Sequence, residues 1–279
     1  MTIRPMLAAD IPAGLHLCRL SRWNQLEDDW RVFLDSPGNG GRLAEADGAP
    51  VGSVAFLRYD RCFSWLSMML VDPDARRGGI GTRLMEAALE ALAGESCVRL
   101  DATPLGEPLY RRFGFDGEYE LIRMTATVAS GGRLQNARPM TADDLPIVFA
   151  RDLEVFGADR SALLASLFRR APDLAWVAPG GATLRGYCFG RPGFRYPQLG
   201  PVVADAAEAA SALAAGALAA HQGEQVAIDV PRLSATEWTA WLASAGFAVE
   251  RPFLRMCRGR NACPGLPDRQ FAIAGPEFG

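Results

Sequence analysis

An internal repeat limits what this 279-residue chain can fold into more than any other feature of its sequence. Three short segments of the first half return in the second half, in the same order: Arg4-Pro5-Met6 as Arg138-Pro139-Met140, Leu70-Val71-Asp72 as Val203-Ala204-Asp205, and Gly114-Phe115 as Gly246-Phe247. The separations are 134, 133 and 132 residues. Because three matches share an almost constant spacing, we interpret the chain as a duplicated unit.

The duplication predicts two domains of similar size. We place the first at residues 1–128 and the second at residues 137–279. The residues between them, 129–136, are mostly small and polar, which is typical of a linker. A chain of this length is long enough to bury two ordinary cores.

The patterns within the first half indicate an α/β (α+β) fold. Apolar residues recur at helical spacing from Ile80 to Ala91, and Asp47-Gly48 is a turn signal of the kind that joins the two strands of a hairpin. The expected helices are 9–19, 28–34 and 80–91, and the expected strands are 42–46, 51–59, 65–71, 97–102 and 120–128. We therefore expect each half to form a mixed central sheet flanked by helices.

The overall composition argues against several classes of function. A net charge of −3 gives no basis for binding nucleic acid, so we expect no such partner. No apolar run reaches the length of a membrane span and no secretory signal is present, so we expect a cytoplasmic protein without a membrane partner. All 29 basic residues are arginine, which excludes chemistry that needs a lysine.

The six cysteines and two histidines are scattered along the chain without a CxxC pair. This distribution argues against a metal site and against a disulfide framework, so we expect no metal cofactor and a reducing compartment. Nothing in the sequence sets the oligomeric state.

The most informative segment for function is the turn between the strand that ends at Val71 and the helix that begins near Ile80. Pro73 ends the strand, and three glycines precede or open the helix. Glycines let a ligand approach the backbone closely, and the first N–H groups of a helix have no internal partner and carry the positive end of its dipole. Together with Arg76 and Arg77, these groups predict a site for a pyrophosphate.

Two known phosphate motifs do not fit this turn, because the lysine of a P-loop and the GxGxxG spacing are both missing. The pattern Arg76-x-x-Gly79-x-Gly81 instead resembles the (Gln/Arg)-x-x-Gly-x-(Gly/Ala) signature of GNAT N-acetyltransferases. The resemblance implies acetyl-CoA as the co-substrate. It assigns the pantetheine arm to Met69, Leu70 and Val71, and the pyrophosphate to Arg76, Arg77, Gly78, Gly79, Ile80, Gly81 and Thr82. A glycine-rich turn without a ligand is the alternative.

A second segment, Leu109-Tyr110-Arg111-Arg112-Phe113-Gly114-Phe115, resembles the Leu-Tyr-x-x-x-Gly-Phe segment of the same family. The resemblance implies that Tyr110 lies near the sulfur of coenzyme A and protonates the departing thiolate, a role that suits an O–H donor. A tyrosine that only packs in the core is the alternative. The sequence departs from the family at Thr103, seven residues before this tyrosine, where an asparagine is common.

The second half keeps the repeat but not these motifs. Asp205-Ala206-Ala207-Glu208 stands where the glycine-rich turn should be, and no tyrosine precedes Gly246-Phe247. Because carboxylates repel a pyrophosphate, we expect the second domain to be a degenerate GNAT-like domain without a cofactor site.

Candidates for the base and for the acceptor site are less well defined. An amine must lose a proton before or during its attack, and we rank Glu45 and Asp101 first among the acids that could accept it, because both lie on strands expected to lead toward the cofactor. The segment 21–30 lies where the family places its acceptor loop, and Trp23, Asn24 and Asp28 suit a cationic, amphipathic acceptor.

The resulting hypothesis is acetyl transfer from acetyl-CoA to a primary amine of a small molecule. A protein N-acetyltransferase and a non-catalytic sensor of acyl-CoA are the alternatives. An intact Tyr110 argues against the sensor, which needs no acid at the sulfur.

Overall fold

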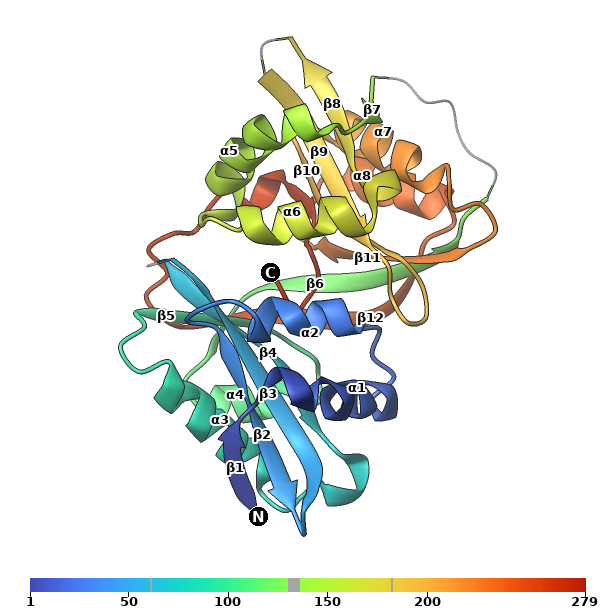
Figure 1. Cartoon of the computed structure of the whole chain (residues 1–279). Coiled ribbons are helices and arrows are strands. Elements are labelled where there is room, and N and C mark those ends of the chain that lie inside the picture. Colours follow the sequence, from blue (N-terminus) through green and yellow to red (C-terminus); the bar gives the residue numbers. More distant parts are fainter. Residues whose placement is uncertain (61, 130–135, 182) are drawn as a thin grey trace.

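The computed structural model of the chain describes residues 1–60, 62–129, 136–181 and 183–279. Six residues of the predicted linker, 130–135, lie outside the described residues. The expected mixed α/β class is confirmed, because the strands form one large sheet with helices on its faces (Figure 1).

The first half of the chain follows the predicted order of elements. It consists of β1 (Thr2–Pro5), α1 (Ile11–Leu20), α2 (Glu27–Leu34), β2 (Gly40–Ala46), β3 (Ala49–Tyr59), β4 (Phe63–Val71), α3 (Ile80–Ala91), β5 (Cys97–Ala102), α4 (Glu107–Arg112) and β6 (Asp116–Thr127). The sequence patterns missed β1 and α4. The predicted β2–β3 hairpin is confirmed: Asp47 and Gly48 have φ values of 51° and 80°, as a two-residue turn between twisted strands requires.

The second half repeats this order of strands and helices and then adds one strand. It consists of β7 (Arg138–Pro139), α5 (Leu145–Phe156), α6 (Ser161–Arg170), β8 (Trp176–Gly180), β9 (Thr183–Arg191), β10 (Gln198–Ala204), α7 (Ala207–Leu218), β11 (Gln225–Pro231), α8 (Thr236–Ser244), β12 (Ala248–Gly259) and β13 (Gln270–Ala272). The repeat seen in the sequence is therefore a repeat of structure. The additional strand, β13, pairs with β10.

The two halves exchange their last strands. The sheet has the order β1-β2-β3-β4-β5-β12-β6-β11-β10-β9-β8-β7, so β12 lies between β5 and β6. β12 pairs antiparallel with β5 of the other half, and β6 pairs antiparallel with β11. In Figure 1 these strands cross the middle of the molecule, where the two sets of helices meet. The exchange places residues near the end of the chain beside strands of the first half.

The repeated Arg-Pro-Met segments hold a strand to the helical turn that follows it. The guanidinium of Arg4 donates hydrogen bonds of 2.7 and 2.9 Å to the two carboxylate oxygens of Asp10, and Arg138 binds Asp144 in the same way at 2.7 Å each. Each carboxylate also accepts a 2.8 Å bond from the backbone N–H three residues earlier. We call this arrangement the Arg–Asp clasp. Its presence in both halves explains why this part of the repeat is visible in the sequence.

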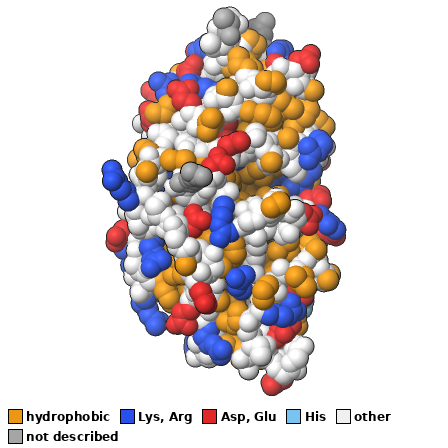
Figure 2. All heavy atoms as spheres, turned by 60° about the vertical axis from the view of Figure 1, so that its left-hand side comes forward, with side chains coloured by type: hydrophobic (Ala, Val, Ile, Leu, Met, Phe, Trp, Pro, Cys, Tyr) orange, Lys and Arg blue, Asp and Glu red, His pale blue; other side chains and the backbone are white. Residues whose placement is uncertain are grey.

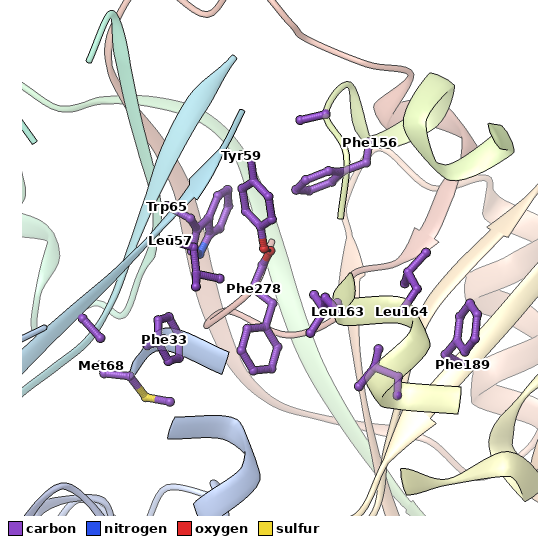
Figure 3. Close-up of a cluster of buried hydrophobic side chains, with 14 of the residues drawn as sticks. Phe33, Leu57, Tyr59, Trp65, Met68, Phe156, Leu163, Leu164, Phe189 and Phe278 are labelled. Atoms are coloured by element: carbon purple, nitrogen blue, oxygen red, sulfur yellow. The ribbon is translucent and has the colours of Figure 1, made fainter. Parts of the chain in front are cut away.

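An aromatic core joins the two halves (Figure 3). Tyr59 of β3 packs edge-to-face on Phe156 of α5, with 5.0 Å between ring centroids, and Phe33 of α2 stacks on Phe278 at 5.6 Å. The Tyr59 hydroxyl donates a 2.7 Å hydrogen bond to the carbonyl oxygen of Phe278. Each such aromatic pair is worth roughly 0.5–1.5 kcal/mol beyond the area it buries. The C-terminal tail is thus anchored in a core to which the first half contributes.

A disulfide links Cys62, just before β4, to Cys263, which follows β12, with 5.6 Å between the Cα atoms. The scattered cysteines had argued against a disulfide framework, and this one bridge corrects that expectation for Cys62 and Cys263. The two residues are 201 positions apart, and the strand exchange brings them together.

Within the ranges given above, no helix is both long enough and apolar enough to cross a bilayer. The same part of the chain contains no group of three or more His, Cys, Asp or Glu side chains arranged to hold a metal ion.

Candidate functional site

The site begins where β4 and β5 separate. Their parallel pairing joins Ser64 with Val98 and Trp65 with Arg99, whereas β4 continues to Val71. The pairing of β3 with β4 shifts near Met68, which has φ of 50°. Between the pairs Ser53–Leu70 and Ala55–Ser67, β4 has two residues where β3 has one. Such a bulge bends a strand and disrupts its pairing. We attribute the separation of β4 from β5 to this bulge, which no sequence pattern signalled.

The glycine-rich turn follows directly from the separated end of β4. Arg77 and Gly79 adopt left-handed conformations with φ of 68° and 76°, and Gly79 is the N-cap of α3. A Cβ atom at Gly79 would meet no atom within 4 Å, so the space above this residue is open. The first N–H groups of α3 have no partner inside the helix, and the open space beside Gly79 leaves room for an anion at this helix N-terminus.

A cleft of about 770 Å³ runs from this turn to the inner part of the sheet, which is the size of an ordinary cofactor site, about 300–1,000 Å³. The predicted cofactor residues that line it are Met69, Leu70, Val71, Arg76, Arg77, Gly79, Ile80, Gly81 and Thr82. Gly78 is not in the lining. The structure therefore brings nine of the ten predicted cofactor residues into one cleft.

Tyr110 lies at the inner end of this cleft, on the short helix α4. Its side chain is buried, and it lines both the cleft and a second, smaller pocket of about 40 Å³. A Cβ atom at Gly106 would fall 2.9 Å from the Tyr110 ring, so the close approach of the ring requires a glycine at this position. Burial raises the pKa of Tyr110 well above its ordinary value, so the phenol stays protonated at neutral pH.

Of the two predicted acids, Asp101 lies at the site and Glu45 does not. Asp101 on β5 lines both the cleft and the smaller pocket, and burial raises its pKa. Arg255 of the exchanged strand β12 donates a 2.8 Å bond to each of its oxygens. Glu45 on β2 instead forms an ion pair of 2.7 Å with Arg4, and it lines neither cavity.

The predicted acceptor residues lie only partly at the site. Trp23 and Asn24 line the smaller pocket, which we call the acceptor pocket. The Asn24 amide is also structural, because it donates 2.9 Å to the carbonyl of Tyr196 and accepts 2.8 Å from the backbone N–H of Arg195. Asp28 is exposed and pairs with Arg170 at 3.6 Å, outside the lining of either cavity.

The sequence patterns did not indicate the residues that the second half and its tail bring to the acceptor pocket. These are Arg251 and Phe253 of β12 and Pro276 and Glu277 of the tail, which face Arg123 of β6. Glu277 is buried, accepts a hydrogen bond from Arg191, and has its pKa raised by burial. No local pattern marks these residues, because only the exchange of β12 and the return of the tail place them there.

The fold and the cleft together define a class: a duplicated α/β protein with a cleft at a glycine-rich turn and a smaller pocket that both halves line. The chain belongs to the GNAT acetyltransferase family. Acetyltransferase (GNAT) domain models match residues 38–116 and 148–272. The protein is therefore a tandem GNAT acyltransferase, and GNAT domains generally use acetyl-CoA.

Curated relatives match most of the chain. A holothin acyltransferase from Pseudoalteromonas sp. is 30% identical over 92% of this chain and 87% of its own length. An uncharacterized N-acetyltransferase, YitH, from Bacillus subtilis is 25% identical over 78% of this chain and 77% of its own.

Solved structures share the complete fold. A putative acetyltransferase from Pyrococcus horikoshii superposes with a TM-score of 0.83 at 22% identity, covering 100% of this chain and 95% of that one. A tandem GNAT protein from the clavulanic acid biosynthesis pathway has a TM-score of 0.63 at 15% identity, covering 92% of this chain and 97% of its own.

Proposed function

We propose that the protein transfers the acetyl group of acetyl-CoA to a primary amine of a small molecule, by direct attack within a ternary complex. The observation that carries this proposal is the position of Tyr110. Tyr110 lines both the cofactor cleft and the acceptor pocket, and its phenol is protonated. The junction of the cleft and the pocket is where a thioester and an amine must meet for a direct transfer.

The residues of the cleft fit acetyl-CoA, which would supply the thioester. The free N–H groups at the start of α3 and the guanidinium groups of Arg76 and Arg77 suit its pyrophosphate. The backbone of residues 69–71, separated from β5 by the bulge, is available to the amides of the pantetheine arm.

Within this proposal, Tyr110 holds the proton that the departing sulfur receives. The proton of the amine goes to a carboxylate of the acceptor pocket. Asp101 and Glu277 both lie there, and both have raised pKa values that favour accepting a proton. Both oxygens of Asp101 are engaged by Arg255, whereas Arg191 engages one oxygen of Glu277. We therefore assign the base to Glu277, in place of Glu45, which does not line the pocket.

The shape of the acceptor side supports a small molecule rather than a protein substrate. Phe253 and the tail residues Pro276 and Glu277 close the pocket from the second half, leaving about 40 Å³ at its inner end. On the face drawn in Figure 2, acidic and basic side chains are interspersed rather than gathered by sign, which also argues against a nucleic acid as the acceptor.

A screen of primary amines for thiol release from acetyl-CoA tests the proposal. We expect at least one small amine to release thiol, with the acetylated amine identified by mass. Holothin belongs in the screen because a relative is named for acylating it. Binding of acetyl-CoA without thiol release for any amine would favour the sensor, and release only with peptides or proteins would favour the protein N-acetyltransferase.

A further inference from the structure

Two arginines face each other across the centre of the sheet, at the wall of the acceptor pocket. Arg251 of β12 is the direct cross-strand partner of Arg123 on β6. Both guanidinium groups lie near the ring of Phe253, with carbon-to-centroid distances of 5.1 and 5.5 Å. Like charges at directly opposed positions of a sheet destabilise it, so this pair needs a compensating interaction.

Only one of the two arginines is compensated by the protein. Arg123 donates hydrogen bonds of 2.8 and 2.7 Å to the two oxygens of Asp229. Arg251 forms no ion pair with the residues that the structure describes, and its Nε atom is buried without a hydrogen-bond partner. The other carboxylates of the pocket are already engaged, Asp101 by Arg255 and Glu277 by Arg191.

The surroundings of Arg251 make its charge costly to keep. Desolvation and then the charge of Arg123 lower the pKa of Arg251 from its ordinary value. An unpaired, partly buried cation at a pocket wall opposes folding. A residue with a purely structural role has no need of such a charge, so the charge of Arg251 points to a functional role. The attraction of a bound anion would offset both the desolvation cost and the repulsion.

The anion is not expected to be a phosphate of coenzyme A. The anion site for its pyrophosphate lies at the start of α3, with Arg76 and Arg77 at the outer part of the cleft. Arg251 lines both the acceptor pocket and the cleft, as Tyr110 does, so it lies at the junction where the proposed function places the acetyl group and the acceptor. An anion at this junction belongs to the acceptor.

We propose that Arg251 binds a carboxylate on the acceptor, so that the preferred substrates are small amino acids with a free amine and a free carboxylate. This proposal rests on the proposed function and specifies its substrate class. A guanidinium suits this role because its planar donors match the two oxygens of a carboxylate. The pocket then offers a cation for the carboxylate and Glu277 for the amine.

The test compares matched sets of probes: alanine, serine and phenylalanine, the amide of each, and the amine that lacks the carboxyl group. Thiol release from acetyl-CoA gives kcat/KM for each probe. We expect the wild-type protein to favour an acid over its amide by about tenfold to a hundredfold, the size of a hydrogen bond to a charged group. Arg251→Gln should remove this preference, so that each acid and its amide give similar kcat/KM values.

Arg258→Gln is the matched control, because Arg258 is an exposed arginine of the same strand and lines neither cavity. It should keep the preference for acids. Arg251→Gln should also melt no lower than the wild type, since it relieves the repulsion from Arg123. A lower melting temperature together with equal losses on acids and amides would mark Arg251 as structural and overturn the proposal.

A binding measurement separates this proposal from the proposed function. Calorimetry with the complex of the protein and coenzyme A should show that an acid binds at least tenfold more tightly to the wild type and Arg258→Gln than to Arg251→Gln. If no amine of the screen is acetylated but this difference appears, the proposed function fails and the carboxylate site stands. If amides match acids in both turnover and binding to the wild type, the carboxylate site is wrong.

Discussion

The two halves share a frame but differ in how a strand passes into the next helix. Between β4 and α3 the chain uses eight residues, 72–79, with left-handed conformations at Arg77 and Gly79. Between β10 and α7 it uses two residues, 205–206, and the N-cap Ala206 is extended, with φ of −154°. The second half therefore has no loop that could wrap a pyrophosphate, although its helix occupies the corresponding place.

A second difference lies in the gap between strands. β10 and β11 pair through Gln198–Ala227 and Leu199–Ile228 and then separate, just as β4 and β5 do. In the second half, however, β13 fills the gap: it pairs with β10, and the N–H of Ile273 donates 3.0 Å to the carbonyl of Asp229 on β11. One copy of the repeat leaves its gap open, while the other closes it with its own backbone.

Repulsion of a pyrophosphate by Asp205 and Glu208 is a weaker reason to expect no second cofactor site than these two differences in backbone structure. Asp205 pairs with Arg151 and, at 3.6 Å, with Arg269, and Glu208 pairs with Arg185 at 3.6 Å. These carboxylates are largely compensated and would repel a phosphate only weakly. The missing loop and the strand β13 are the stronger physical reasons.

The largest expected effect is on turnover, from Tyr110→Phe. The change removes a hydroxyl that the second half lacks at the corresponding place, where Trp241 and Leu242 stand. We expect kcat to fall by about a hundredfold or more, the usual size of a general-acid contribution, with the affinity for acetyl-CoA nearly unchanged. Steady-state kinetics with an amine found in the screen measures both. A loss confined to KM would make Tyr110 a binding residue, and unchanged kcat with chemistry rate-limiting would remove it from the mechanism.

The next effect is on ligand-linked stability, from Gly79→Val. At a hundredfold excess over its dissociation constant, coenzyme A should stabilise the wild type by about 2.7 kcal/mol, and the variant should lose this gain because the side chain occupies the space open to the pyrophosphate. Thermal melts with and without coenzyme A measure the difference.

Gly223→Val is the matched control for Gly79→Val. Gly223 also has a positive φ, 82°, and a Cβ atom there would likewise meet nothing within 4 Å. Both variants should therefore pay a similar backbone strain, about 1–2 kcal/mol, but only Gly223→Val should keep the shift with coenzyme A. A shift retained in Gly79→Val would show that the cofactor binds elsewhere.

The third effect is on stoichiometry: one molecule of coenzyme A bound per chain rather than one in each half. Since β13 fills the second gap and the loop before α7 is short, calorimetric titration with coenzyme A should give about one site per chain. A value near two, with one site surviving Gly79→Val, would show that the second half also binds the cofactor.

The lining of the cleft at the glycine-rich turn could be predicted from the sequence because its determinants are local. A glycine-rich turn and the helix after it are fixed by neighbouring residues, so their chemistry is visible in one short segment. Nine of the ten residues predicted there line the cleft. The bulge at Met68 was not predictable in this way, because it depends on pairing with β3 rather than on residue type.

The acceptor side could not be predicted because its determinants are distant in sequence. Arg251 and Glu277 reach the pocket only through the exchange of β12 and the return of the tail. The repeat predicted two similar units, but a repeat carries no information on whether a terminal strand pairs within its own unit or with the other. The ion pair of Glu45 with Arg4 likewise depends on the pairing of β1 with β2, and the sequence patterns did not indicate β1.

The smallest expected effect concerns the Arg–Asp clasp, which both halves keep. Arg4 has Glu45 as a second partner at 2.7 Å, whereas Arg138 forms an ion pair with Asp144 alone among the described acids. Replacing Asp10 by Asn leaves Arg4 paired with Glu45. Replacing Asp144 by Asn leaves Arg138 without an ion pair among the described acids. We therefore expect both variants to melt about 1–3 °C lower than the wild type at neutral pH, with the larger loss for Asp144→Asn.

The pH dependence of this loss tests whether it is electrostatic. The arginine of each clasp lowers the pKa of its aspartate in the folded protein. A lowered folded pKa stabilises the protein above the unfolded pKa of about 3.9, and the gain is lost as the pH falls toward the folded value. The melting temperatures of wild type and variants should therefore differ fully above about pH 5 and converge as the pH drops below 4. A difference that persists unchanged at pH 2 would mean that the clasp acts through geometry alone, and equal losses for the two variants would mean that Glu45 gives the first half no support.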